Sequence, residues 1–196
     1  MPKKFQNKYR ISSTRLQNWD YRWAGAYFIT ICCKDRRHYF GEIQNGKMNL
    51  SNVGVLANVF WYEIKNHAQN VELGEYIIMP NHIHGILILK NDENAVAETR
   101  HVGSVEAGHA LPLQNENDKT IGQKRFQNPG KNSVSSIVGS YKSAVSKHAN
   151  RLGYEFEWQS RFHDHIIRDQ QSFSRITNYI INNPANWKED KLYENS

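Results

Sequence analysis

Two short apolar runs, residues 26–33 and 86–89, place the strongest constraint on how this chain can fold. The first run is rich in β-branched and aromatic residues, and the second is dense in Ile and Leu. A strand that is apolar on both faces is typical of the middle of a sheet, because other elements cover both of its faces. We therefore predict that these two runs are central strands.

Three stretches with apolar residues at helical spacing are predicted to be helices. The first begins at a capping Asn52 and ends near residue 66. The second covers residues 133–153, from a capping Ser133 to a terminal glycine. The third begins at Ser172 and stops at the Asn-Asn-Pro sequence of residues 182–184. The residues of the third helix expected to face inward are Phe173, Ile176, Ile180 and Ile181.

The remaining elements complete a recognisable order. A hairpin is predicted around Asn45-Gly46, a dipeptide that favours a tight turn between residues 40–44 and 47–50. Residues 75–79 and 162–168 are predicted to be strands. The order strand, helix, strand, strand, helix, strand predicts an α+β fold of the ferredoxin-like, split βαβ type. It has an antiparallel sheet with helices packed on it and an added C-terminal helix, and its first and third core strands are central.

Length and composition are consistent with one domain over residues 1–196. Residues 91–132 interrupt the pattern with Asn, Asp, Glu, Gln and Gly and are expected to be a flexible insertion. No apolar stretch approaches the roughly 20 residues of a membrane span, and no apolar signal core follows Met1. We therefore expect a cytoplasmic protein with no membrane partner. Adjacent Cys32 and Cys33 have poor geometry for a disulfide and are interpreted as small strand residues.

Positive charge is concentrated in two parts of the chain. Nine basic residues face two acidic ones through residue 40, and a second excess runs from residue 119 to 168. Basic residues interleaved with aromatic ones favour single-stranded nucleic acid, whose bases stack on rings, over a membrane surface. Modest basicity that only aids solubility is the competing interpretation. The candidate DNA-binding residues are Arg10, Arg15, Arg22, Lys34, Arg36, Arg37, Lys142 and Arg161.

The sequence Met-Pro-Asn-His-Ile-His-Gly at residues 79–85 is the motif that most directly indicates chemistry. Side chains alternate along a strand, so His82 and His84 project from one face, close enough for both imidazoles to reach one metal ion. Two ligands alone rarely hold a metal, and a histidine pair at the start of a strand is often only a polar edge. The spacing leaves both interpretations open.

Tyr141 and His148 lie seven residues apart on the apolar stripe of the second helix, so both are expected to face the sheet. An aromatic residue at core spacing usually belongs to the core. The expected proximity of Tyr141 to a histidine, to Lys142 and to the strand with the paired histidines favours a functional role for it instead.

Four segments in order resemble the tyrosine transposases associated with repetitive extragenic palindromes (REP). These proteins belong to the HUH superfamily, named for histidine, hydrophobic residue, histidine, and are related to the insertion-sequence single-strand transposases. The segments are Ala26–Thr30, Met79–Gly85, Ser140–Ala144 and Trp158–Phe162. The resemblance implies a single-strand DNA endonuclease and strand transferase whose tyrosine forms a 5′-phosphotyrosine link and releases a 3′-hydroxyl. Hairpin or palindromic DNA is the implied partner, and both single-chain and homodimeric sites are consistent with it.

The resemblance also implies roles for individual residues. The metal-binding pair falls on His82 and His84, which would hold Mg²⁺ or Mn²⁺, and the nucleophile falls best on Tyr141, with Tyr154 as an alternative. Related transposases have a further polar ligand one turn beyond the tyrosine, where this chain has Val145. The substitutes considered for that ligand are His148 and His165, while His163 and Asp164 are interpreted as polar-edge residues.

Two other functions compete with this hypothesis. A non-catalytic, domesticated DNA-binding protein on the same scaffold is favoured by Val145 and disfavoured by the retained histidines and tyrosine. A histidine-triad nucleotide hydrolase needs a third histidine two residues past the pair, and that position is Ile86.

Overall fold

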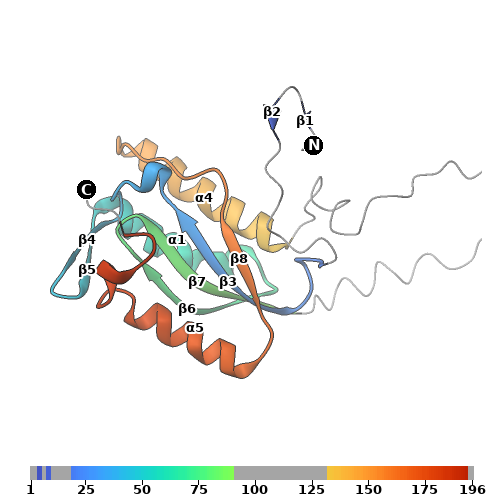
Figure 1. The fold of residues 1–196 in the computed structure, drawn as a ribbon. Coiled ribbons are helices and arrows are strands. Elements are labelled where there is room, and N and C mark those ends of the chain that lie inside the picture. The colour runs from blue at the N-terminus through green and yellow to red at the C-terminus, as the bar shows by residue number, and fades with distance from the viewer. Residues whose placement is uncertain (1–3, 6–7, 10–18, 91–131, 194–196) are drawn as a thin grey trace, which may run out of the picture.

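The computed structural model describes residues 4–5, 8–9, 19–90 and 132–193 (Figure 1). Two short strands, β1 (Lys4–Phe5) and β2 (Lys8–Tyr9), pair with each other ahead of the main fold. The predicted insertion at residues 91–132 lies outside the described residues except for Asn132. No helix in the described part of the chain has the length and apolar character needed to cross a membrane.

A four-stranded antiparallel sheet forms the centre of the fold. Its strands are β3 (Gly25–Cys32), β6 (Val71–Ile78), β7 (His82–Leu89) and β8 (His163–Ile167), in the order β6-β7-β3-β8. The first and third core strands, β3 and β7, are central, as their two-sided apolar character predicts. The α+β class and the ferredoxin-like strand order are confirmed.

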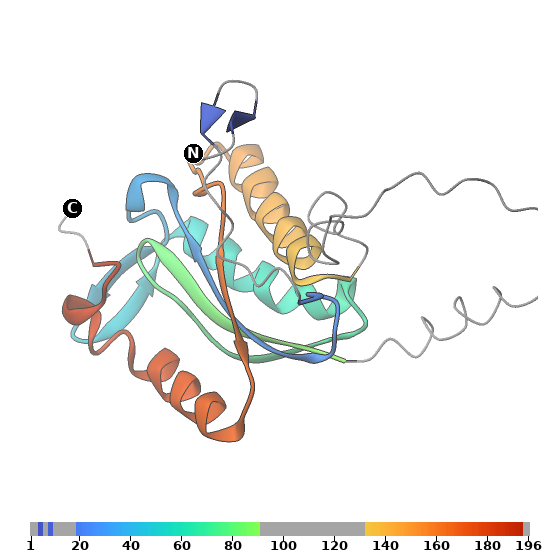
Figure 2. The same cartoon turned by 45° about the vertical axis from the view of Figure 1, so that its right-hand side comes forward.

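Helices cover the two faces of the sheet unequally. The crossover helices α1 (Asn52–His67) and α4 (Val134–Arg151) pack together on one face, and α5 (Gln170–Asn182) covers the opposite face (Figure 2). Each face has its own apolar core. The larger one lies under α1 and α4, and the smaller one is formed around Ile86, Ile167 and Ile180 under α5.

Alternation along β7 decides which side chains reach which core. Ile83 and Leu87 belong to the core under α1 and α4, and Gly85 faces the same way, against Trp61 of α1. Ile86 faces α5, so His82 and His84, which are even-numbered like Ile86, face α5 as well. The histidine pair therefore lies on the face that carries α5.

Shorter elements lie between these strands and helices. The predicted hairpin is present as β4 (Gly41–Gln44) and β5 (Lys47–Leu50), with Asn45 and Gly46 at positive φ in its turn. A 3₁₀ turn, η1 (Lys34–Arg36), follows β3, and a second, η3 (Trp187–Glu189), follows α5.

Two predicted helix starts and one inward residue are wrong. The cap of α1 is Ser51, whose side chain accepts from the Gly54 N–H, and α5 is capped by Asp169 rather than begun by Ser172. Ile181 is 54% exposed, because the inward stripe of α5 continues through Ile180 instead. The predicted cap of α4, Ser133, is confirmed and forms a capping box with Ser136.

We expect Gly85→Ala to destabilise the protein by about 1–3 kcal/mol, because the added methyl group would overlap the Trp61 ring. The matched control is Gly139→Ala in α4, where a methyl group meets no atom within 4 Å and where alanine favours the helix by about 0.5–1 kcal/mol. Urea unfolding of both variants measures the difference. Equal stability of Gly85→Ala and wild type would contradict the packing of β7 against α1.

Candidate active site

The two histidines of β7 are buried side chains. His82 is fully buried and His84 is 3% exposed, and their ring centroids are 4.4 Å apart. They are held on a central strand by pairing with β3 on one side and β6 on the other. A rigid support of this kind is what a metal or catalytic group needs. The structure thus excludes the polar-edge interpretation, because the rings are not solvated.

Asn81 fixes the orientation of the His82 ring. The carboxamide oxygen of Asn81 lies 2.8 Å from Nδ1 of His82, and its amide donates to the Leu192 carbonyl at 2.9 Å. An amide oxygen only accepts, so His82 carries its proton on Nδ1. Its Nε2, which is buried and has no hydrogen-bond partner in the described structure, is left with an unshared electron pair. A buried ring nitrogen in this state is suited to bind a cation.

His84 connects β3 to α5. Its Nδ1 is 2.9 Å from Oγ1 of Thr30, and its Nε2 is 3.1 Å from the hydroxyl of Tyr179 in α5. The same Tyr179 hydroxyl is 2.9 Å from Oδ2 of Asp190, in the segment that follows η3. Because Asp190 in its ionised form only accepts, the tyrosine donates to Asp190 and accepts from Nε2–H of His84. Tyr179 is therefore hydrogen-bonded to both groups through one oxygen.

Burial and neighbouring charges set the ionisation of these groups. Burial lowers the pKa of His84 from 6.5 to about 4, and burial together with the neighbouring His84 lowers the pKa of His82 well below 6.5. Both rings are thus neutral near pH 7, the form that binds metals. Burial raises the pKa of the Tyr179 hydroxyl above its ordinary value of 10, and the hydrogen bond to Asp190 raises it further.

Asp190 completes a cluster of three side chains that could together hold a metal ion. Burial raises the pKa of its carboxyl, but hydrogen bonds from the Asn183 amide, the Leu192 N–H and Tyr179 outweigh it, so the net pKa is lowered. Ligand atoms of His82, His84 and Asp190 all lie within 4.8 Å of one another. Two imidazole nitrogens and one carboxylate oxygen fit a divalent cation such as Mg²⁺ or Mn²⁺ whose remaining ligands are oxygens. The orphaned Nε2 of His82 supports this fit.

The structure does not bring Tyr141 to the histidine pair. Tyr141 belongs to the core under α1 and α4, its ring packs edge-on against Trp61 at 5.3 Å, and its hydroxyl donates to the Ala57 carbonyl. The sheet separates this core from the face of the histidines. Burial raises the pKa of Tyr141 well above 10. The position predicted for the nucleophile is thus occupied by a core residue.

The residues considered as a third ligand also lie elsewhere. His148 is on the Tyr141 side, where its ring packs on Phe60 and its Nδ1 lies 3.0 Å from the Ala144 carbonyl. His165 shares the α5 face, opposite Phe28, but is exposed and outside the three-residue cluster. Val145 is fully buried in the larger core. Tyr154, the alternative nucleophile, packs against that same core.

Tyr179 and Asp190 are the site residues that sequence reasoning missed. Tyr179 sits three residues after Ile176 and just before Ile180, on the apolar stripe of α5, and Asn183 lies one turn beyond it. A polar tyrosine on an otherwise apolar stripe was the available signal. Asp190 had no signal, because only the fold of the C-terminal segment brings it to β7.

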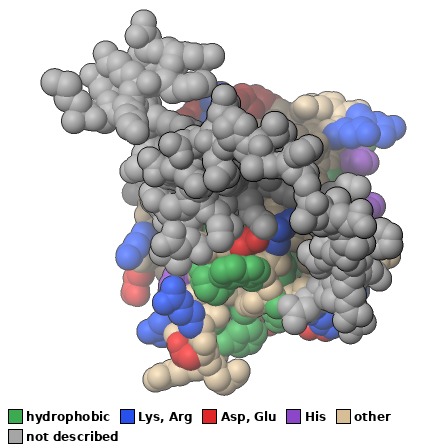
Figure 3. All heavy atoms as spheres, turned by 90° about the vertical axis from the view of Figure 1, so that its right-hand side faces the viewer, with side chains coloured by type: hydrophobic (Ala, Val, Ile, Leu, Met, Phe, Trp, Pro, Cys, Tyr) green, Lys and Arg blue, Asp and Glu red, His purple; other side chains and the backbone are tan. Residues whose placement is uncertain are grey.

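The predicted DNA-binding cations are dispersed. Lys34, Arg22 and Arg37 form ion pairs with Glu157, Asp20 and Glu155, respectively. Lys142 and Arg161 belong to α4 and to the segment before β8, and Arg36 to η1. On the face in Figure 3, the visible Lys and Arg side chains are interspersed with acidic ones and form no single patch. Arg10 and Arg15 lie outside the described residues.

The chain has the fold of a REP-associated tyrosine transposase solved bound to a REP hairpin, with a TM-score of 0.54 and 18% identity over 92% of this chain and 77% of that one. No protein-family model matches the sequence. An uncharacterized protein of Haemophilus influenzae is 36% identical over 185 residues, 92% of each chain. The chain belongs to the same family as this Haemophilus influenzae protein.

The free energy of unfolding of the metal-free protein should fall as the pH is lowered from about 6.5 to 4. Above 6.5, His84 is neutral in both folded and unfolded chains. Below pH 6.5 the unfolded chain binds a proton at His84, whereas the folded chain does not bind it until about pH 4. His84 alone therefore lowers the free energy of unfolding by roughly 3 kcal/mol over this range. Denaturant unfolding in EDTA should show a shallower pH dependence for His84→Gln than for wild type. The exposed His67→Gln serves as the control, and parallel curves for all three proteins would contradict the assignment.

Proposed function

We propose that the protein cuts and rejoins single-stranded DNA, with hairpin or palindromic strands as substrates and Tyr179 as the nucleophile. The observation that carries the proposal is the placement of the Tyr179 hydroxyl 3.1 Å from His84 and 2.9 Å from Asp190, two members of the candidate metal cluster. The transposase fold supports the same activity. Tyr179 replaces Tyr141 in this role, because Tyr141 lies behind the sheet with its hydroxyl bound to a backbone carbonyl.

Tyr179 is placed for attack on a phosphodiester. It projects from a helix whose neighbouring residue Ile180 is fully buried against the sheet, so the position of the ring is fixed. The residue is nevertheless 45% exposed, so solvent reaches part of Tyr179. A buried phenol such as Tyr141 has no such access. Access together with fixed orientation is what a nucleophile requires.

The transfer step balances with the groups present. The Tyr179 oxygen attacks phosphorus and forms the tyrosyl phosphoester, the bond from phosphorus to the 3′ oxygen breaks, and the 3′ oxygen takes up one proton and leaves as a hydroxyl. That proton balances the one that Tyr179 gives to Asp190. The proton of Tyr179 already points to Asp190, which is the acceptor within hydrogen-bonding distance. The product keeps the energy of the phosphoester, so a second 3′-hydroxyl can reverse the step.

A divalent cation would be held by His82, His84 and Asp190. When bound, Mg²⁺ or Mn²⁺ supplies a Lewis acid that polarises the phosphate oxygens and neutralises developing negative charge. Burial and the neighbouring Asp190 raise the pKa of Tyr179, so the phenol is protonated near pH 7. His84 can use Nε2 as a ligand only after its proton moves from Nε2 to Nδ1 and the hydrogen bond to Tyr179 is lost. Occupation of the cluster therefore changes the partners of the tyrosine oxygen.

Covalent capture should depend on Tyr179 and not on Tyr141. With a hairpin oligonucleotide and Mn²⁺, wild type should form a denaturation-resistant protein–DNA adduct, and Tyr179→Phe should form none because it lacks the attacking oxygen. Tyr141→Phe is the matched control and should retain capture while losing about 1 kcal/mol of stability from its hydrogen bond to Ala57. Absence of an adduct in wild type would favour a non-catalytic DNA-binding protein. Formation of the adduct by Tyr179→Phe would show that Tyr179 is not the nucleophile.

Metal affinity should depend on Asn81 although it is not itself a proposed ligand. Asn81→Ala removes the acceptor that keeps the His82 proton on Nδ1, so Mn²⁺ affinity should fall roughly 10- to 100-fold. Isothermal titration calorimetry measures this loss, with Asn49→Ala in the exposed hairpin as the control. Unchanged affinity in Asn81→Ala would show that His82 does not take part in the site through Nε2.

A further inference from the structure

Thr30 is a buried polar residue of β3 that the transfer step described above does not use. It lies directly opposite His84 in the register of β3 and β7, and its Oγ1 is 2.9 Å from Nδ1 of that histidine. Only 9% of the residue is exposed. The partner of Nδ1 is therefore a side-chain hydroxyl shielded from water, and not a carbonyl or a carboxylate.

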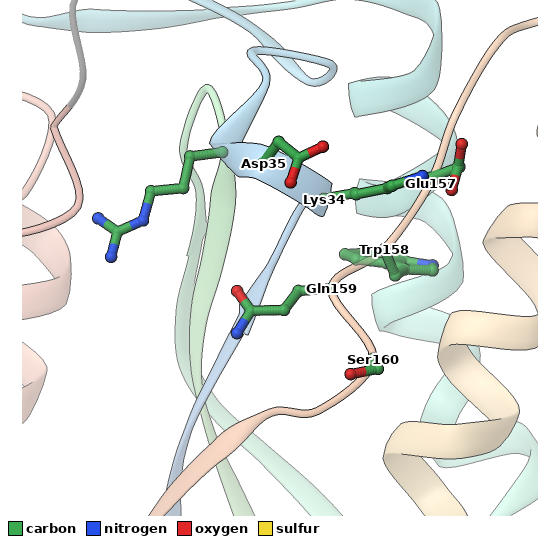
Figure 4. A pocket seen from close by; sticks show the side chains of 7 residues that line it. Lys34, Asp35, Glu157, Trp158, Gln159 and Ser160 are labelled. Carbon is green, nitrogen blue, oxygen red and sulfur yellow. Dashed lines mark hydrogen bonds and ion pairs between the residues drawn. The ribbon is translucent and has the colours of Figure 1, made fainter. Parts of the chain in front are cut away.

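The surroundings of β3 hold Thr30 in a fixed position. The strand is paired with β7 on one side and with β8 on the other. The segment that precedes β8 is also bonded to the end of β3, where the Gln159 N–H donates to the Cys32 carbonyl at 2.9 Å (Figure 4). Threonine is branched at Cβ, which restricts its χ1 angle. The Thr30 hydroxyl is therefore kept beside the His84 ring.

The ring of His84 is fixed by its own neighbours. Its centroid is 4.4 Å from that of His82 and 5.1 Å from that of Phe28. Its two nitrogens are bonded to different elements, Nδ1 to Thr30 in β3 and Nε2 to Tyr179 in α5. A change in which nitrogen carries the proton needs no rotation of the ring, so this packing can stay as it is.

The partners of the two histidines differ in what they permit. Asn81 presents an amide oxygen to Nδ1 of His82, and because such an oxygen only accepts, one proton position is favoured in His82. A hydroxyl both donates and accepts, because it rotates about its C–O bond. Thr30 can therefore donate to an Nδ1 of His84 that lacks a proton, or accept from one that carries it.

The structure contains the first of these two states. The Tyr179 hydroxyl donates to Asp190 and accepts from Nε2–H of His84, so Nδ1 of His84 has no proton and accepts from Thr30. A cation at Nε2 requires the second state. One proton then leaves Nε2 for solvent and one from solvent binds at Nδ1, so the ring stays neutral. Thr30 accepts from the new Nδ1–H, and the Tyr179 oxygen loses its N–H donor.

We propose that Thr30 is a positioning residue that allows His84 to change from a hydrogen-bond donor to Tyr179 into a ligand of a divalent cation. The inference rests on the proposed function, because it uses the cation site of that proposal. It adds that His82 is held in its ligand form at all times, whereas His84 takes that form only when the site is filled. A group that only accepts, in place of Thr30, would hold His84 in the ligand form and separate it from Tyr179.

Nitrogen NMR of isotope-labelled histidine rings tests the change of tautomer. The His84 signals should show a protonated Nε2 in the metal-free protein and a protonated Nδ1 with saturating Mg²⁺, which is diamagnetic. The signals are assigned by their loss in His84→Gln and His82→Gln. A protonated Nδ1 in the metal-free protein, or a protonated Nε2 of His84 while the His82 signals shift with Mg²⁺, would overturn the role of Thr30. Absence of any shift at His82 would instead refute the cation site of the proposed function.

Substitutions separate this role of Thr30 from packing. Thr30→Val keeps the branched shape without the hydroxyl, so the Nδ1–H of the ligand form has no acceptor and Mn²⁺ affinity should fall roughly 10-fold. The metal-free form loses less, because a bound cation makes Nδ1–H a stronger donor. Thr30→Ser keeps a hydroxyl and should bind Mn²⁺ as wild type does.

The matched control is Thr177→Val in α5, since the Oγ1 that it removes has no hydrogen-bond partner in the described structure. Isothermal titration calorimetry with Mn²⁺ should give the same affinity for this variant and wild type. Equal affinities of Thr30→Val and wild type, or a loss in Thr30→Ser as large as that in Thr30→Val, would overturn the proposal.

Discussion

The alternation of side chains along β7 is the constraint on which the rest of the structure depends. A strand buried on both faces sends Ile83, Gly85 and Leu87 to one core and His82, His84 and Ile86 to the other. Close approach of Trp61 to Gly85 fixes this register, because no other residue type fits there without displacement. A shift of one residue would bury the histidines under α1 and α4, away from α5.

The C-terminal part of the chain supplies the remaining residues of the candidate site. α5 brings Tyr179 to His84, and the segment after η3 brings Asp190 to both. Burial acts on both kinds of group: it keeps the imidazoles neutral and raises the pKa of the phenol. The ionised Asp190 holds the phenol proton by accepting its hydrogen bond. A divalent cation at the cluster would compete for the same nitrogen and oxygen atoms.

Much of the fold follows from the sequence, and the reason is local. The apolar runs identify the central strands, Asn45-Gly46 identifies the hairpin, and Ser133 identifies the start of α4, because each pattern has one structural outcome. The prediction that His82 and His84 share one face of a strand is correct for the same reason. Tyr141 shows the limit: helical periodicity indicates that a side chain faces a sheet, but not which face of the sheet carries the helix. Asp190 depends on the course of the C-terminal segment, which no local pattern encodes.

The central claim is that the phenol on the α5 face, and not the one in the larger core, becomes linked to DNA. Peptide mapping of the wild-type adduct by mass spectrometry tests it directly, because trypsin separates the two tyrosines. The account predicts that the nucleotide is attached to the peptide of residues 176–188, in which Tyr179 is the sole tyrosine. Attachment to the peptide of residues 132–142, which contains Tyr141, would contradict it.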